Sequence, residues 1–199
     1  PHTQLRFDRA MKCRHYGQRA GVQLRIHQAS PPMSGDTIHQ ETRMCVSDAV
    51  RLSADSPHVP AVLDLIRKSF AFMETRINPP SSMHRLSLTA IKEQCVSGEV
   101  WIIGEQPDAC VFFTKKPDCI YIGKLAVSKS KRGRGYARQL IDLAAHRARV
   151  NGVSALELET RIELDENHET FRRLGFRKTG EGAHAGFCKP TYVIMRKPV

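Results

Sequence analysis

The sequence has no apolar run that approaches the roughly 18 residues of a membrane-spanning helix. Its first residues also lack the apolar core of a secretory signal. From these two absences we expect a cytoplasmic protein with no membrane partner. The six cysteines include no Cys-x-x-Cys pair and no histidine at the spacing of a zinc site, so we expect reduced thiols and no metal.

Two common phosphate-binding motifs are missing as well. Gly133-x-Gly135 has no third glycine three residues further on, and Gly123-Lys124 is followed by leucine instead of serine or threonine. The first departure excludes a dinucleotide fingerprint, and the second excludes a Walker loop.

Residues 1–43 differ in composition from the rest of the chain. They carry seven basic and three acidic side chains, show little apolar periodicity and include a stretch rich in serine and proline at residues 30–35. This composition predicts a disordered or non-native extension. An organelle transit peptide is the alternative, although serine is scarce. We interpret the remainder, residues 44–199, as a single domain, because a chain of 199 residues that is 41% apolar has the size and balance of one domain with a core.

From residue 44 onward, apolar periodicity predicts alternating strands and helices. Helical spacing marks residues 58–76, 88–97, a long segment that ends at Asn151-Gly152, and 166–174. Strand patterns mark residues 49–54, 100–103, 110–114, 120–127, 156–160, 176–180 and 191–196. Short connections favour antiparallel neighbours, and the central strand, helix, strand unit favours one parallel pair. We therefore expect an α/β (α+β) fold of three αβα layers around a mixed, mostly antiparallel sheet of six or seven strands.

The apolar pattern of the strand at residues 120–127 changes phase. Ile120 and Ile122 are apolar at even positions, whereas Leu125 and Val127 are apolar at odd positions. Because strand side chains alternate between faces, this slip predicts a β-bulge near Gly123-Lys124. A bulge would bend the strand and leave backbone groups of residues 125–127 available for an extended ligand.

A basic, glycine-containing turn follows this strand and opens the long helix. Its residues are Lys131, Arg132, Gly133, Arg134, Gly135, Tyr136 and Ala137. The first amides of a helix lack intrahelical acceptors, and glycine allows phosphate oxygens to approach them, so the turn predicts a pyrophosphate site. Residues 44–199 carry a net charge of +7, and the basic run has no acid before Asp142. Nucleic acid is the weaker interpretation of this charge, because the aromatic residues are not interleaved with it.

These motifs together resemble the GNAT superfamily of N-acetyltransferases. The turn is similar to that family's Arg/Gln-x-x-Gly-x-Gly/Ala signature, and residues 124–127 resemble its fourth strand. The segment from Glu166 to Phe176, which contains Leu174-Gly175-Phe176, resembles its late Asn-x-x-x-Tyr-x-x-x-Gly-Phe helix. The resemblance implies the GNAT fold and an acetyltransferase that uses acetyl-CoA.

The resemblance also implies roles for individual residues. The cofactor would be held by Leu125, Ala126, Val127, Arg132, Gly133, Arg134, Gly135, Tyr136, Ala137 and Asn167, although Asn167 has a helix N-cap as its alternative role. We expect Glu159 to be the base that deprotonates the amine, with Glu157 or a chain of waters as alternatives. Phe171 stands where many family members have a tyrosine that protonates the leaving thiolate, and phenylalanine has no proton to donate.

The acceptor is expected to be a small-molecule amine that carries a carboxylate or phosphate, with Arg76, Arg161 and His184 as its contacts. A surface or hydrogen-bonded loop histidine is the alternative for His184. Two other functions stay open, namely a non-catalytic CoA-binding or regulatory module and a protein or peptide N-acetyltransferase. Association into a homodimer is a further expectation.

Overall fold

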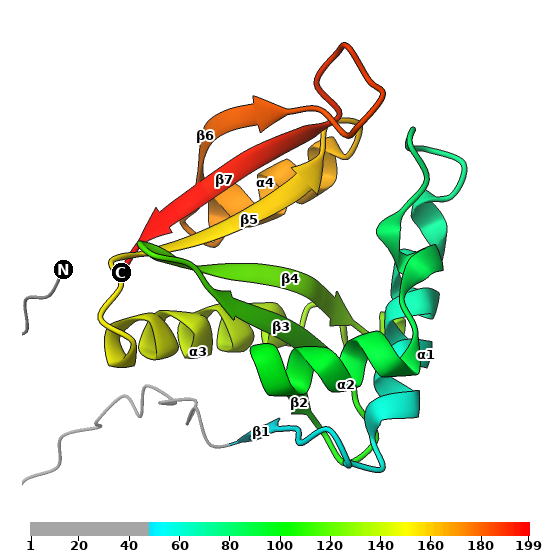
Figure 1. Ribbon diagram of the computed structural model, residues 1–199, viewed down its shortest axis with the longest axis vertical. Helices are drawn as coiled ribbons and strands as arrows, with labels where there is room; N and C mark the ends of the chain where they lie inside the picture. Colours follow the sequence, from blue (N-terminus) through cyan, green and yellow to red (C-terminus); the bar gives the residue numbers. More distant parts are fainter. Residues whose placement is uncertain (1–47) are drawn as a thin grey trace, which may run out of the picture. The chain divides into compact units, whose positions relative to one another are not determined.

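The computed structural model describes residues 48–199. The extension expected at residues 1–43 and its boundary with the domain therefore lie outside the described residues. Within the part that is described, the predicted α/β architecture is confirmed as a seven-stranded mixed sheet with helices on both faces (Figure 1). None of these helices is both long and apolar enough to cross a membrane.

The sheet has the strand order β1-β2-β3-β4-β5-β7-β6. Its strands are β1 (Ala49–Arg51), β2 (Glu99–Ile103), β3 (Ala109–Lys115), β4 (Cys119–Val127), β5 (Ala155–Arg161), β6 (Arg177–Gly182) and β7 (Tyr192–Pro198). All neighbours are antiparallel except β4 and β5, which are parallel. The short connections and the one strand, helix, strand unit thus produced the predicted pairings.

Two helical layers cover the sheet. The helices α1 (Val59–Phe70) and α2 (Leu88–Ser97) pack on one face over a core that includes Phe112 and Ala126. On the other face, α3 (Tyr136–Val150) contributes Leu140 and Ile141 to a core shared with β4 and β5. The helix α4 (Asp165–Arg173) precedes β6, and 3-10 turns occur at Ala71–Met73, Ser82–Arg85 and Lys129–Lys131.

The helix predicted at residues 58–76 is shorter than expected. It ends at Phe70, and a 3-10 turn follows at Ala71–Met73. The tighter turn changes the direction of the side chains, so that Met73 and Ile77 leave the α1 core and form a separate apolar cluster with Leu164. The first strand is also shorter than the predicted 49–54, because after Arg51 only the Leu52 amide continues to bond β2, through the Val100 carbonyl at 2.8 Å.

The predicted bulge in β4 is confirmed. Cys110 pairs with Ala126 and Phe112 pairs with Gly123, so β4 contains one more residue than β3 between these points. The left-handed backbone angle falls on Lys124 (φ +49°) and not on the neighbouring glycine. The bulge keeps the apolar side chains of β4 on the same face on both sides of it. Leu125 and Val127 lie against the α3 core, as Ile120 and Ile122 do, and Ala126 lies in the opposite core.

Candidate active site

The strands β4 and β5 separate part-way along their length. Their pairing begins at Cys119 with Ala155 and ends at Ile122 with Leu158, although both strands continue beyond these residues. Figure 1 shows the two strands close together at one end and diverging toward the other. A cleft of about 1140 Å³ lies at this divergence. Because it passes between adjacent strands, the cleft is lined from both helical layers.

One half of the cleft is formed by the start of α3. Gly135 is the N-cap residue in the left-handed conformation (φ +83°), and no side chain caps the helix. The first amides of α3 therefore have no acceptor in the helix, and no acidic residue lies in its first turn. Gly133 is also left-handed, at φ +76°, with no atom within 4 Å of where a Cβ would stand. These features form a site that would accept a bound phosphate.

The other predicted cofactor residues lie around this turn. Leu125, Ala126 and Val127 line the cleft, as do the turn residues Arg132, Gly133, Gly135, Tyr136 and Ala137. Arg134 is exposed and is not among the lining residues. Beyond Ile122, β4 has no ladder partner on the β5 side, as the bulge predicted. One group there is already used, since the Val127 carbonyl accepts a hydrogen bond from the Ser69 hydroxyl at 3.3 Å.

The predicted base, Glu159, lies on β5 just past the last residue paired with β4. Its side chain is exposed in the cleft, close enough to the Tyr121 phenol to act on its pKa. Burial, followed by the charges of Glu159 and Glu157, raises the pKa of the Tyr121 phenol, so this hydroxyl stays protonated. A protonated phenol and a carboxylate thus lie near each other at the point where the strands diverge.

The alternative base, Glu157, is placed differently. Its carboxylate lies 2.7 Å from the Lys116 ammonium and 3.6 Å from the Arg196 guanidinium, and it is not among the residues that line the cleft. A carboxylate that is engaged by two cations and lies outside the cleft lining is not placed to meet an amine bound in the cleft. The geometry therefore favours Glu159 over Glu157 as the base.

Asn167 and Phe171 line the cleft from α4. The N-cap residue of α4 is Leu164, so the alternative role of Asn167 as a helix cap is wrong, and Asn167 stands in the first turn with its amide on the cleft. The Phe171 ring packs edge-on against Phe176, with ring centres 5.9 Å apart. It thereby occupies its place through apolar packing alone.

Comparison with known proteins decides the family. The family model described as "Acetyltransferase (GNAT) family" matches residues 61–176, which is more than half of the chain. The chain belongs to the GNAT family. No curated protein matches it in sequence.

Solved structures share the GNAT fold at low sequence identity. An acetyltransferase from Streptococcus agalactiae 2603 is 14% identical with a TM-score of 0.60, covering 77% of this chain and 99% of its own. A GNAT family acetyltransferase from Elizabethkingia anophelis with acetyl-CoA bound is 15% identical with a TM-score of 0.53, over 77% and 99%. A chain of the NatC complex bound to Gag peptide and CoA is 16% identical with a TM-score of 0.54, over 76% and 99%.

The half of the cleft that lies away from the start of α3 is called the acceptor half. It is bounded by the connection between α1 and α2, residues 71–87. The connection is tied to the segment that follows β5. Arg76 forms a bidentate ion pair with Glu166 at the start of α4, and the Asn78 amide donates to the Glu163 carboxylate of the loop at 3.0 Å. Partial burial opposes ionisation of Glu163, but the hydrogen bonds from Asn78 and Arg161 outweigh it and lower the pKa of this carboxyl. The loop and the connection thus close one side of the cleft.

The three residues predicted to contact the acceptor have different positions. Arg76 is outside the cleft lining, and its guanidinium is engaged by Glu166. Arg161 lines the cleft with its guanidinium 3.4 Å from Glu163. His184 also lines the cleft, where its Nδ1 lies 2.6 Å from the Thr191 hydroxyl and its ring packs edge-on against Tyr192.

Sequence reasoning missed Tyr121 and Lys124 as residues of the acceptor half. Tyr121 has the same strand parity as Glu157 and Glu159 in the aligned pairing, which is the signal that could have placed it. Lys124 was expected at the bulge but given no role in the site. The bulge directs its side chain to the acceptor half, where its Nζ donates to the Ser82 hydroxyl at 2.5 Å.

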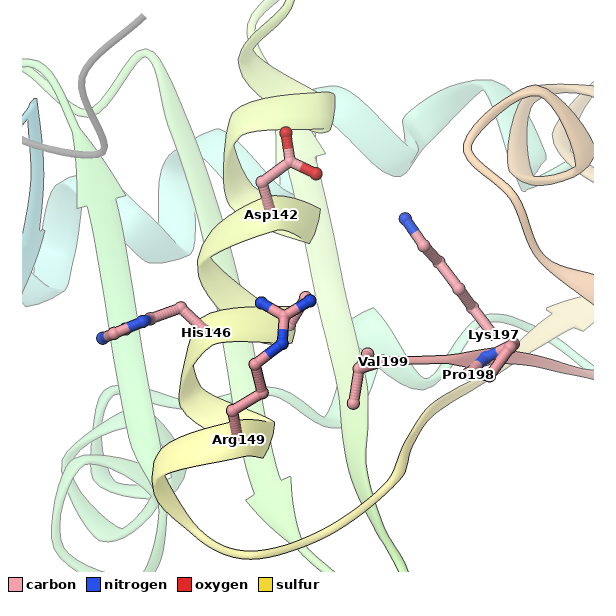
Figure 2. A pocket seen from close by; sticks show the side chains of 7 residues that line it. Asp142, His146, Arg149, Lys197, Pro198 and Val199 are labelled. Atoms are coloured by element: carbon pink, nitrogen blue, oxygen red, sulfur yellow. The ribbon is translucent and has the colours of Figure 1, made fainter. Parts of the chain in front are cut away.

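A second cavity, of about 520 Å³, lies between α3 and the end of β7. Figure 2 shows Asp142, His146 and Arg149 projecting from α3, with Lys197 and Val199 on the facing segment. This cavity has neither free helix amides nor a break between strands, so the candidate active site is the cleft between β4 and β5.

Proposed function

We propose that the protein is an acetyl-CoA-dependent N-acetyltransferase that acetylates the primary amine of a small molecule by direct attack. One observation carries this proposal: the gap between β4 and β5 joins the uncapped start of α3 on one side to the Glu159 carboxylate and the Tyr121 hydroxyl on the other. The first feature suits a pyrophosphate, and the second suits an amine that must lose a proton.

The residues present fit coenzyme A. Gly133 and Gly135 leave the α3 amides accessible, and Arg132 adds a cation with no carboxylate partner among residues 48–199. The unpaired edge of β4 at residues 125–127 offers backbone groups to the pantetheine arm. Bound acetyl-CoA would supply the activated acyl group that the amine attacks.

The side chains then divide the remaining work. Glu159 accepts the proton of the incoming ammonium, directly or through water, and the protonated Tyr121 hydroxyl lies close by. Phe171 cannot protonate the leaving thiolate, so that proton comes from water. Thiols are acidic enough to leave without a protein acid, which makes the substitution compatible with turnover.

The closure of one side of the acceptor half favours a small molecule over a protein or peptide. The apolar contact of Met73 and Ile77 with Leu164 joins the two walls beside the cleft, and the Arg76–Glu166 pair lies next to it. An extended peptide would need this side to be open. The relative bound to a Gag peptide supports the peptide alternative, and Phe171 supports the non-catalytic alternative.

Calorimetry with coenzyme A, followed by a thiol-release assay with acetyl-CoA and a panel of amines, tests the proposal. We expect binding of the cofactor and turnover with at least one small amine. Binding without turnover on any amine or peptide would favour a non-catalytic module. Turnover with peptides alone would favour the peptide alternative.

A further inference from the structure

Lys124 is a cation held in the acceptor half of the cleft by the bulge of β4. Its left-handed backbone (φ +49°) and the extra residue in β4 move its side chain out of the regular alternation of the strand. The side chain reaches Ser82, in the connection between α1 and α2, and both residues line the cleft. The bulge therefore places a charge at the acceptor end of the site.

No carboxylate of residues 48–199 neutralises this charge. The Lys124 ammonium makes its hydrogen bond to a neutral hydroxyl, and the Arg85 guanidinium repels it. The two arginines predicted for the acceptor are paired with Glu166 and Glu163. Lys124 is thus the cation of the acceptor half that is available to a ligand.

This arrangement is costly for the protein without a ligand. Burial, followed by the charge of Arg85, lowers the pKa of the Lys124 ammonium. An anion bound beside it would compensate both effects. An ammonium has three N–H donors and Ser82 uses one of them, so donors remain for such an anion.

Lys124 and Glu159 lie on the same side of the sheet across the diverging strands. Ile122 and Leu158, the last paired residues, pack into the α3 core, so Glu159 faces the opposite side by alternation. Lys124 reaches that side as well, because Ser82 belongs to the segment that packs with α1. The acceptor half consequently presents a positive group on β4 and a negative group on β5.

We propose that Lys124, supported by Ser82, binds a carboxylate of the acceptor, so that the acceptor is a small amine that also carries a carboxylate, as amino acids do. This inference rests on the proposed N-acetyltransferase function and replaces Arg76 and Arg161 by Lys124 as the anion contact. The amine of such a molecule would lie toward Glu159, and its carboxylate toward Lys124. Lys124 is therefore a specificity-determining residue.

The test compares acceptors that differ in charge alone. Glycine, β-alanine, γ-aminobutyrate and the standard α-amino acids are assayed for acetyl transfer beside their carboxamides, with phosphoethanolamine as the phosphate-bearing amine. We expect kcat/KM for the best carboxylate to exceed that of its carboxamide by at least roughly tenfold, the worth of one charge-assisted hydrogen bond. Calorimetric titration of the same pair into protein saturated with coenzyme A gives a second, activity-free measurement.

Three variants assign the preference to a residue. Lys124→Gln should reduce the ratio of kcat/KM between the carboxylate and its carboxamide to near unity, mainly through KM. It should also weaken calorimetric binding of the carboxylate, while the affinity for coenzyme A stays unchanged. Arg85→Gln, at an exposed position that should not disturb folding, should reduce that ratio by a smaller factor. Lys92→Gln, on the exposed side of α2, is the matched control and should leave it intact.

The outcomes separate the inference from the proposed function. Transfer to amines with no preference for the carboxylate, a preference that survives in Lys124→Gln, or a preference for phosphoethanolamine would overturn the inference and leave the acetyltransferase standing. An equal fall in kcat for the carboxylate and its carboxamide in Lys124→Gln would also overturn the inference, because Lys124 would then act on the reacting atoms. No binding of coenzyme A and no transfer to any amine would overturn both.

Discussion

Replacing Gly135 by glutamate tests the cofactor half of the cleft most directly. Gly135 has φ +83° and precedes α3, whose first amides have no side-chain cap. Any L-residue there costs roughly 1–2 kcal/mol of backbone strain. A carboxylate at a helix start returns about 0.3–1 kcal/mol through the helix dipole, so the free energy of unfolding of the unliganded protein should fall by only about 1 kcal/mol.

The affinity for coenzyme A should fall much further. The new carboxylate would compete for the same amides and repel the phosphates. Losing two charge-assisted hydrogen bonds costs about 3 kcal/mol or more, which corresponds to at least roughly a hundredfold increase in Kd. Calorimetry with coenzyme A measures this change, and chemical denaturation measures the stability.

Gly152 supplies a matched control at the opposite end of the same helix. It is also left-handed, at φ +68°, and no atom lies within 4 Å of the point that a Cβ would occupy. Gly152→Glu should therefore cause a similar strain without touching the affinity for coenzyme A. Wild-type affinity for coenzyme A in Gly135→Glu, or equally weakened binding in Gly152→Glu, would refute a phosphate site at the start of α3.

Three further variants test the remaining roles. Phe171→Tyr should preserve or raise turnover in the thiol-release assay, and a large fall would show that this ring does not stand at the position of the family's acid. Glu159→Gln should lower kcat by about 10²–10⁴-fold with coenzyme A affinity unchanged. Glu157→Gln should instead mainly lower the thermal stability, because it removes the ion pair with Lys116. The reverse pattern would exchange the roles of the two carboxylates. Arg76→Gln should leave the free energy of unfolding nearly unchanged, because the ion pair with Glu166 is exposed, yet raise KM for the acceptor. An unchanged KM would show that the pair does not shape the cleft.

Local patterns were sufficient to predict the sheet and the bulge in β4. The phase change around Gly123-Lys124 required an extra residue in β4, and the structure has one there. The helix predicted at residues 88–97 is α2, and the hydroxyl of the preceding Ser87 accepts a hydrogen bond from the Ala90 amide at 3.1 Å. In both cases the cause lies within a few residues of the effect.

The acceptor half could not be predicted in the same way, because its contacts join distant parts of the chain. Arg76 pairs with Glu166, 90 residues away, and this partner removes the charge that composition suggested would meet a substrate. The end of α1 at Phe70 depends equally on a distant residue, since Met73 and Ile77 pack on Leu164. Residue types indicated a basic, polar surface, but only the fold shows which of its charges are already neutralised.

The two halves of the cleft differ in what would hold a ligand. At the start of α3, the donors are backbone amides, whose positions are fixed by the helix and by two left-handed glycines. At the acceptor end, the charged groups are the side chains of Lys124 and Glu159. Replacing a side chain there leaves the path of the two strands unchanged. Substitution at the acceptor end should therefore change the choice of amine while coenzyme A affinity stays constant. A variant such as Lys124→Gln that altered both affinities together would show that the two halves are coupled through the bulge.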